Sequence, residues 1–254
     1  DRRLKDNTDV SVYSGYTFNP ITVFPSVGVE KPQTFIPSKS AQDSYAEQII
    51  ANKPRQSEAF LSDGKGVIYN SHRELNLIGT GNMGVKLDEV ISGKSYQEQE
   101  MIKKNGLIYS FSQTLFSLNM DLQEHLVTEE LIKEDFPANS ISYISSVSYG
   151  CIGLLIVESD NDVAKIRVIV NKVLQANTEG FTQEESIILD ELTAYHLYYD
   201  KSQKLKLTKG KLDVIKAYKA QITDDSYTVF PFKFRISDYF EQGDTNMDFT
   251  LTIP

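Results

Sequence analysis

The chain has 254 residues and a formal net charge of -9, with 26 Lys and Arg against 35 Asp and Glu. This acidic balance, without a dense basic run, argues against a nucleic-acid-binding protein, because a phosphate-binding surface needs a basic face. The single cysteine excludes an internal disulfide, and no apolar run approaches the roughly 20 residues of a membrane-spanning helix.

The N-terminal part is predicted to contain extended strands, loops and one helix. Residues 1–37 become rich in Tyr and Pro after a polar beginning. That beginning lacks an apolar signal core, so a secreted form is expected to be a processed or trimmed one. Residues 40–51 predict a helix, with Ser40 or Asp43 as its cap.

The pattern of residues 67–122 is mainly typical of strands. Between Leu75 and Asp88, apolar and polar residues alternate with few exceptions, which predicts a strand with one apolar face. A polar and charged stretch follows, and residues 107–122 predict a second long strand.

The stretch at 140–157 is dense in Ser, Tyr, Ile and Val and predicts one long strand. Its alternation changes phase near Ser145 and Ser146, which predicts a bulge or bend. Gly150 and Gly153 predict a close approach of another backbone.

Residues 163–174 satisfy two secondary-structure periods at once. Acidic residues just before them supply an N-cap and first-turn charges, so the segment is predicted to be a helix. The helical period places five apolar residues on one face: Val163, Ile166, Val170, Val173 and Leu174. The period of a strand places four on one face: Ala164, Ile166, Val168 and Val170. Four Val and two Ile among these residues raise the strand propensity, and this double pattern is the main indication of function.

The remaining segments alternate between short helices and strands. Helices are predicted at 128–131, 184–192 and 212–219, and strands at 192–199, 204–207, 227–240 and 247–253.

The strongest motif match is the glycine pattern at 79–84, Gly-Thr-Gly-Asn-Met-Gly, which taken alone indicates a dinucleotide-binding enzyme. Such a site needs a following strand that ends in an acidic residue, whereas the strand from Leu107 ends in Ser112 and Gln113. An NAD(P)-dependent oxidoreductase is therefore the least favoured of the functions considered.

The other chemistry-bearing residues form no catalytic constellation. His72, His125 and His196 have no metal-ligand spacing, so no zinc site is expected. Cys151 is interpreted as a small buried hydrophobic residue, and no nucleophile elbow is present. The sequence predicts a protein that is not an enzyme, needs no cofactor or metal, and works by binding or assembly.

Residues 143–150, Tyr-Ile-Ser-Ser-Val-Ser-Tyr-Gly, follow a strand ending at Asp121 and the stretch 126–131, Leu-Val-Thr-Glu-Glu-Leu. In this order they resemble the SSVAYGR segment of the cholesterol-dependent cytolysins, secreted bacterial pore-forming toxins, with Cys151 in place of the arginine. The likeness covers roughly residues 65–240. The chain has no Trp, and the resemblance is to the short cytolysin-like proteins, which lack the cholesterol-binding fourth domain.

The resemblance implies an α+β fold, with a bent antiparallel central sheet flanked by two helical clusters and no C-terminal membrane-binding domain. It implies a core lobe at 31–66, 120–150 and 223–243, a pore-forming lobe at 67–119 and 151–222, and a β connector at 1–30 and 244–254.

In that family, both helical clusters of the soluble monomer rearrange into amphipathic hairpins of an oligomeric β-barrel. The resemblance therefore implies secretion as a soluble monomer, a large ring of copies of the chain, and insertion into a target-cell membrane. A longer cytolysin-like protein is the implied partner. A non-lytic β-rich surface or interaction protein is the alternative from a different class.

The resemblance also assigns candidate residues. Strand pairing between subunits falls to Tyr69, Leu192 and Tyr195, and Tyr198 and Tyr199 stand where the family has its hinge glycines. Lys209 and Glu74 are the candidates for an intersubunit salt bridge. The membrane-inserting candidates are Leu77, Met83, Val85, Leu87, Leu118, Met120, Ile166, Val168 and Val170.

Overall fold

The computed structural model describes residues 17–26, 31–52, 59–62, 66–83, 86–92, 101, 103–121, 126–128, 142–175, 180–200, 202–223 and 228–240. The chain divides into two compact units. Unit 1 comprises Asp1–Glu58, Thr114–Tyr149 and Pro231–Pro254, and unit 2 comprises Ala59–Gln113 and Gly150–Phe230. The predicted division into core lobe, pore-forming lobe and connector stays a prediction.

Unit 1 contains short antiparallel strands and parts of two long ones. The long strands are β5 (Asn105–Met120) and β6 (Ser142–Ser159), which contribute residues to both units. β1 (Ile21–Pro25) pairs antiparallel with β2 (Gln33–Phe35) and with the end of β5, and β9 (Phe230–Asp238) pairs with β6.

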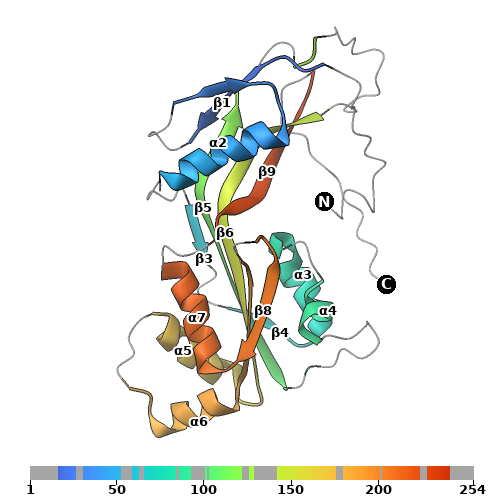
Figure 1. The fold of residues 1–254 in the computed structure, drawn as a ribbon. Coiled ribbons are helices and arrows are strands. Elements are labelled where there is room, and N and C mark those ends of the chain that lie inside the picture. Colours follow the sequence, from blue (N-terminus) through green and yellow to red (C-terminus); the bar gives the residue numbers. More distant parts are fainter. Residues whose placement is uncertain are drawn as a thin grey trace. The chain divides into compact units, whose positions relative to one another are not determined.

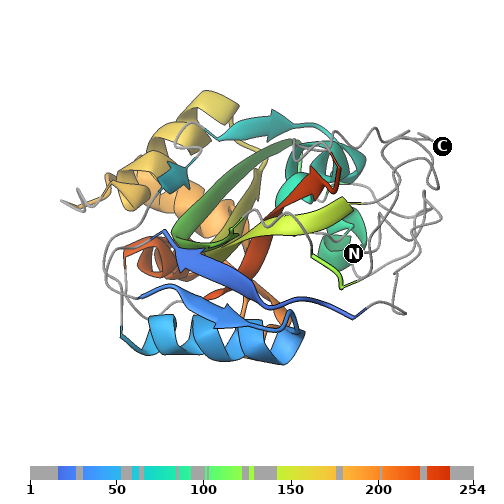
Figure 2. The ribbon, with the colours of Figure 1, turned by 90° about the horizontal axis from the view of Figure 1, so that it is seen from above.

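The helix described in unit 1 is α2 (Lys39–Ala51), which runs beside β1 and β2 (Figures 1 and 2). Its cap is Ser38, whose Oγ accepts a hydrogen bond from the Ala41 backbone N–H at 3.2 Å. The predicted cap at Ser40 or Asp43 is therefore wrong. An N-cap lies outside the helix, whereas both of these residues lie within it. The helix buries Tyr45, Ala46 and Ile49.

Unit 2 is a sheet covered by helices. Its strands include β3 (Ala59–Ser62), β4 (Val67–Tyr69), β7 (Thr193–Tyr199) and β8 (Leu205–Gly210). Their order is β4-β5-β6-β7-β8, with β3 also paired to β5, and the pairs β4–β5, β6–β7 and β7–β8 are antiparallel. This open antiparallel sheet with helices confirms the predicted α+β class.

The helices of unit 2 form two clusters on opposite faces of its sheet (Figure 1). We call α3 (His72–Met83) and α4 (Leu87–Ser92) the first cover. We call α5 (Val163–Leu174), α6 (Gln183–Glu191) and α7 (Leu212–Thr223) the second cover. Because both faces are covered, every residue of β6 from Gly150 to Ser159 is buried.

The main hydrophobic core of unit 2 lies beneath the second cover. The buried residues that form it are Leu107, Tyr109, Phe111, Cys151, Leu155, Val157, Ile166, Ile169, Val170, Val173, Ile188, Leu189, Leu192, Ala194, Val214, Ile215 and Tyr218. Cys151, Leu155 and Val157 of β6 contribute to this face, as the two-residue period of a strand requires.

The predicted strand at Leu75–Asp88 is wrong, because this segment forms α3 and the start of α4. The Glu74 N–H donates to Ser71 Oγ at 3.4 Å, and Glu74 Oε2 accepts from the Asn70 N–H at 2.8 Å. This arrangement closely resembles a capping box, which favours a helix at this point. The local Ser-x-x-Glu spacing is therefore the signal that the alternating pattern obscured.

Two glycines of the nucleotide-type motif, Gly79 and Gly81, lie inside α3. A dinucleotide site needs those glycines in a turn between a strand and a helix. The position of these glycines therefore does not support an NAD(P)-dependent oxidoreductase.

The predicted helix at 163–174 is confirmed as α5, together with its acidic cap. Asp162 Oδ1 accepts from the backbone N–H groups of Ala164 at 2.8 Å and Lys165 at 3.4 Å. The helix buries Ile166, Ile169, Val170 and Val173, so tertiary packing outweighs the strand propensity of these residues.

Gly153 makes space for side chains rather than for a backbone, which corrects the prediction for this glycine. A Cβ placed on it would lie 2.4 Å from the Phe111 ring and 2.7 Å from Gln221 Oε1. Nearby, Cys151 is fully buried, and burial raises the pKa of its thiol to about 12. The interpretation of Cys151 as a small buried hydrophobic residue is thus confirmed.

Some predictions fall on parts of the chain that are not described. These are most of the helix at 128–131, the strand at 247–253 and His125. Among the described helices, none combines the length and apolar character needed to cross a membrane. The described residues also hold no cluster of three or more His, Cys, Asp or Glu that could bind a metal ion.

Candidate functional site

The polar contacts that attach both covers to the sheet of unit 2 are buried. One lies beneath the first cover and centres on Glu158 of β6, which is fully buried. The Tyr69 hydroxyl donates to Glu158 Oε1 at 2.9 Å, and His72 Nε2 lies 2.6 Å from the same oxygen. Since Tyr69 ends β4 and His72 begins α3, a single carboxylate joins three elements of the unit.

Burial dominates the electrostatics of this cluster. It raises the pKa of Tyr69, and the neighbouring Glu158 carboxylate raises it further. Burial and then Glu158 also raise the pKa of Tyr195 to about 12. Both phenols are therefore neutral at physiological pH, and Tyr69 acts as a hydrogen-bond donor to the carboxylate.

The cluster is only partly satisfied. Among the described residues, Glu158 Oε2 and His72 Nδ1 are buried without a hydrogen-bond partner. An unsatisfied buried polar atom costs about 1–3 kcal/mol. The first cover is thus held by hydrogen bonds to Glu158 Oε1. The two unsatisfied atoms of the same cluster offset part of this stabilisation.

Two aromatic rings fix β4 against β5. The Tyr69 ring covers Gly106, its partner in the register, so that a Cβ there would lie 2.3 Å from the ring. The Tyr109 ring covers Gly66 in the same way at 2.7 Å, and Gly66 has a left-handed φ of +63°. Tyr69 is therefore fully buried, whereas the other two residues of β4, Val67 and Ile68, are exposed.

The second cover is attached through His196 of β7. Its Nε2 lies 2.7 Å from Gln221 Oε1 of α7. The imidazole stacks on Tyr198 at 4.7 Å and meets the edge of Tyr218 at 5.6 Å. Burial lowers the pKa of His196, while the Gln221 bond raises it by a smaller amount. A neutral imidazole therefore donates from Nε2 to α7.

β8 covers the outer edge of β7. Six register pairs join the two strands, from Ala194↔Gly210 to Tyr199↔Leu205. Four consecutive residues of β8, from Lys206 to Lys209, are exposed. β7 is consequently an inner strand whose edge would become free if β8 moved away.

The turn between β7 and β8 has its own hydrogen bonds in place of hinge glycines. The Asp200 carboxylate accepts from the backbone N–H groups of Ser202 at 2.9 Å and Lys204 at 3.0 Å. Gln203 has a left-handed φ of 55°, which is uncommon for a residue other than glycine. Before the turn, Tyr199 packs on Phe230 with ring centroids 4.7 Å apart.

The remaining candidates for contacts between subunits are Leu192, Lys209 and Glu74. Leu192 is not part of β7, because it is the C-cap of α6 and its N–H donates to the Ile188 carbonyl. Lys209 Nζ lies over the Tyr195 ring at 5.3 Å from its centroid. Glu74 caps α3, and among the described residues it forms no ion pair with Lys209.

The membrane-inserting candidates divide into three groups. Leu87, Ile166 and Val170 are buried residues of the covers, whereas Val168 is 62% exposed. Leu77 and Met83 lie in α3 with side chains outside the described part, and Val85 is wholly outside it. Leu118 and Met120 lie in the unit 1 part of β5.

Leu118 and Met120 lie in a paired part of β5, and their insertion stays a prediction. They pair with Pro25 and Val23 of β1, so they already belong to a formed antiparallel sheet. Both residues belong to unit 1, because the boundary between the units falls after Gln113, whereas both covers belong to unit 2.

The solved structures that match this chain include listeriolysin O and pneumolysin. Listeriolysin O matches with a TM-score of 0.62 and 13% identity, over 91% of this chain and 52% of its own. This chain has the cytolysin fold. A non-hemolytic pneumolysin from Streptococcus pneumoniae matches at 0.61 and 16%, over 91% and 53%. A structure described as the sugar-binding protein pneumolysin matches at 0.66 and 14%, over 96% and 55%.

The cytolysin fold is established here by structure alone. No protein-family model and no curated protein sequence matches the chain. The chain spans about half the length of the solved structures that it matches. What those toxins do as whole proteins is therefore a proposal for this one.

Removing the carboxylate of Glu158 tests the attachment of the first cover. Glu158→Ala should lower the free energy of unfolding by about 3–5 kcal/mol, because it leaves Tyr69 and His72 buried without their acceptor. Urea denaturation measures this change. Glu184→Ala is the control, since that carboxylate is 71% exposed in its ion pair with Lys165, and its loss should cost about 1 kcal/mol or less. Equal effects of the two substitutions would contradict this role of Glu158.

The lowered pKa of His196 predicts an acid-sensitive second cover. The unfolded chain binds a proton at His196 below about pH 6.5, whereas the folded chain resists protonation, so stability should fall as the pH drops through this range. Urea denaturation at several pH values should show a smaller loss in His196→Gln than in the parent chain. Identical pH dependence in both would contradict the attachment through a neutral His196.

Proposed function

We propose that this protein is a component of a pore-forming toxin whose two covers convert into transmembrane β-hairpins after copies of the chain pair strand to strand. The observation that carries this proposal is the arrangement of β7 and β8. β7 is an inner strand whose outer edge is covered only by the short, exposed β8. An uncovered strand edge is a strong template for pairing with another chain.

The complementary edge in this proposal is β4. It pairs with β5 on one side and with no other described strand. Tyr69 and Tyr195 are both buried, so pairing between subunits uses backbone groups rather than these side chains. With Leu192 in the cap of α6, we assign the pairing strand to Thr193–Tyr199.

The double pattern of α5 supports the conversion to a hairpin. The helix explains Ile166 and Val170, which are buried, but it does not explain an apolar side chain at Val168, which is exposed. In an extended strand, all three would face the same side. A transmembrane strand needs about 9–11 residues with such alternation, and α5 spans 12 residues.

The finer proposals extend the cytolysin likeness to assembly. They are a ring of copies of this chain, a longer cytolysin-like partner, a lipid target, and secretion as a soluble monomer. Glu74 and Lys209 belong to elements that move in this scheme, α3 and β8, and we propose that they pair across subunits after that movement. Tyr198 and Tyr199 remain hinge candidates because they lead directly into the turn to β8.

A disulfide between β7 and β8 tests the proposal directly. Leu197→Cys/Leu207→Cys joins residues that are partners in the register. The oxidised variant should neither release dye from liposomes nor form rings in electron micrographs, and reduction should restore both. The assay uses the full chain, with and without a longer cytolysin-like protein.

The matched control is Thr22→Cys/Thr34→Cys in unit 1. These residues also oppose each other across two strands, with hydroxyl oxygens 2.9 Å apart. This bridge should leave dye release unchanged. Full release from the oxidised β7–β8 variant would refute the proposed strand exchange. Rings or binding without release, in the reduced state, would instead favour a non-lytic interaction protein.

A charge at Val168 separates the helical state from the inserted one. Val168→Lys should leave the soluble fold intact, because the side chain is 62% exposed and Lys is a better helix former than Val. It should abolish dye release, because a Lys on the lipid-facing side of a transmembrane strand costs about 2–4 kcal/mol near the bilayer midplane. Ile36→Lys is the control, since Ile36 is also 62% exposed but lies in unit 1. Normal release by Val168→Lys would contradict the proposed strand.

A further inference from the structure

A row of residues crosses the sheet of unit 2 on the face that carries the first cover. Each of the strands β4 to β8 contributes one member, in the order in which the strands pair. The members are Tyr69, Gly106, Glu158, Tyr195 and Lys209. Tyr69 and Lys209 therefore belong to the two outer strands, β4 and β8, that the proposed strand exchange involves.

The register places the β6, β7 and β8 members of the row on one face. Lys209 is the direct partner of Tyr195. Glu158 is the direct partner of Thr193, and Tyr195 lies two positions further along β7, on the same side of that strand. Such diagonal neighbours are about 7–8 Å apart, a distance that long and aromatic side chains can bridge.

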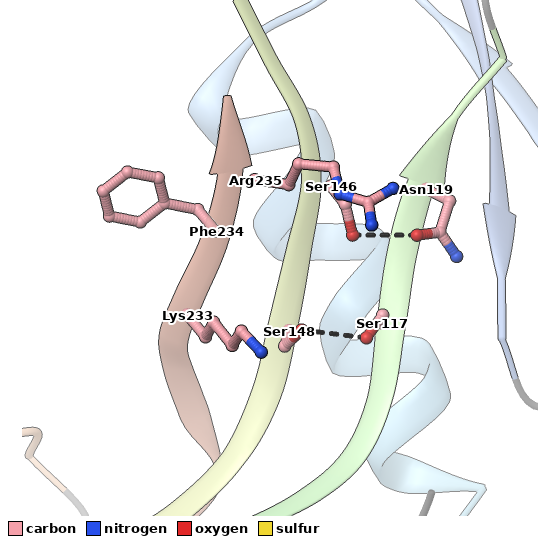
Figure 3. A pocket seen from close by; sticks show the side chains of 7 residues that line it. All are labelled: Ser117, Asn119, Ser146, Ser148, Lys233, Phe234 and Arg235. Atoms are coloured by element: carbon pink, nitrogen blue, oxygen red, sulfur yellow. Dashed lines mark hydrogen bonds between the residues drawn. The ribbon is translucent and has the colours of Figure 1, made fainter. Parts of the chain in front are cut away.

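At the β4 end, the row crosses β5 because Gly106 has no side chain. The Tyr69 ring lies over Gly106, and its hydroxyl donates to Glu158 Oε1 of β6 at 2.9 Å. A side chain of an edge strand thus reaches the second strand along. In unit 1, by contrast, Ser146 of β6 donates to Asn119 of β5, its direct neighbour, at 2.8 Å (Figure 3).

At the β8 end, the row finishes with a cation. Lys209 Nζ lies over the Tyr195 ring at 5.3 Å from its centroid, which is a cation–π distance. Tyr195 is buried and Lys209 is exposed, so an exposed cation lies against a buried ring. Burial and then the Glu158 carboxylate raise the pKa of Tyr195 to about 12, which agrees with a carboxylate close to this phenol.

The cation matters because the hydrogen bonding of Glu158 is incomplete. Its Oε2 is one of the buried atoms without a hydrogen-bond partner in the described part of the chain. Charges interact more strongly in a buried site than in water, so an ammonium beyond Tyr195 stabilises the carboxylate. The carboxylate in turn holds Tyr69 at the end of β4 and His72 at the first residue of α3.

We propose that this row couples the two outer strands, with Tyr195 and Lys209 as positioning residues for Glu158. When β8 leaves β7, Lys209 leaves the Tyr195 ring, and the carboxylate loses the stabilising cation. Its hold on β4 and on the first cover then weakens. The coupling is a property of the soluble chain, whereas its use in pore formation rests on the proposed function.

Hydrogen exchange of the soluble full chain, measured by mass spectrometry without membranes, tests the coupling. Lys209→Met removes the ammonium but keeps an unbranched side chain over Tyr195. Amide exchange in α3 and β4 should become about threefold or more faster, while α5 on the opposite face exchanges as in the parent chain. Lys209→Arg should restore slow exchange, because a guanidinium also binds an aromatic face.

The control is Lys206→Met, which removes the same charge from the same strand. Lys206 is the partner of Tyr198 and lies three positions from Lys209, so it is on the opposite face of β8. Exchange in α3 should therefore stay unchanged. Equal acceleration by the two substitutions would indicate a general loosening of β8 and overturn the coupling. Parent-like exchange in Lys209→Met would overturn it as well.

A double substitution separates a coupled row from two independent contacts. Tyr69→Phe removes the hydroxyl that donates to Glu158 and should itself accelerate exchange in α3. Because both changes act through Glu158, Tyr69→Phe/Lys209→Met should accelerate exchange by less than the product of the two single effects. An acceleration equal to that product would contradict the coupling.

Dye release from liposomes distinguishes failure of the coupling from failure of the proposed function. Faster α3 exchange in Lys209→Met, together with a parent chain that releases no dye, supports the coupling and contradicts pore formation. Dye release by the parent chain, together with unchanged α3 exchange in Lys209→Met, overturns the coupling alone.

Discussion

The buried carboxylate of Glu158 is the constraint on which unit 2 depends. It lies in the central strand, accepts from Tyr69 at the end of β4, and contacts His72 at the first residue of α3. A buried carboxyl oxygen without these partners would be left unsatisfied, which costs free energy. The same oxygen atom therefore stabilises both the edge strand β4 and the first cover. Movement of one should weaken the attachment of the other.

The opposite face is held differently. There the second cover buries an extensive apolar core, and the contact between His196 and Gln221 is one of its polar attachments. α5 is helical because its cap and this core favour a helix, while its own Val and Ile content favours a strand. Its secondary structure thus depends on remaining packed, which is the property that a convertible segment requires.

Local chemistry determined which parts of this fold could be predicted. The Asp162 cap and the apolar stripe of α5 act over a few residues, so the sequence indicates them directly. The alternation at Leu75–Asp88 predicts a strand, whereas the short capping signal from Ser71 to Glu74 favours the helix that forms there. His72 and Glu158 are 86 positions apart in the sequence, so no local pattern predicts their contact.

The position of Cys151 has a practical consequence. Its sulfur is fully buried beneath the second cover, near Gln113 Oε1, and its proton is held tightly. Maleimides and other alkylating reagents attack only the exposed thiolate. The native chain should thus react little with reagents for site-directed cysteine labelling. The rate at which its own thiol is slowly modified measures how fast that face of the sheet becomes accessible to solvent.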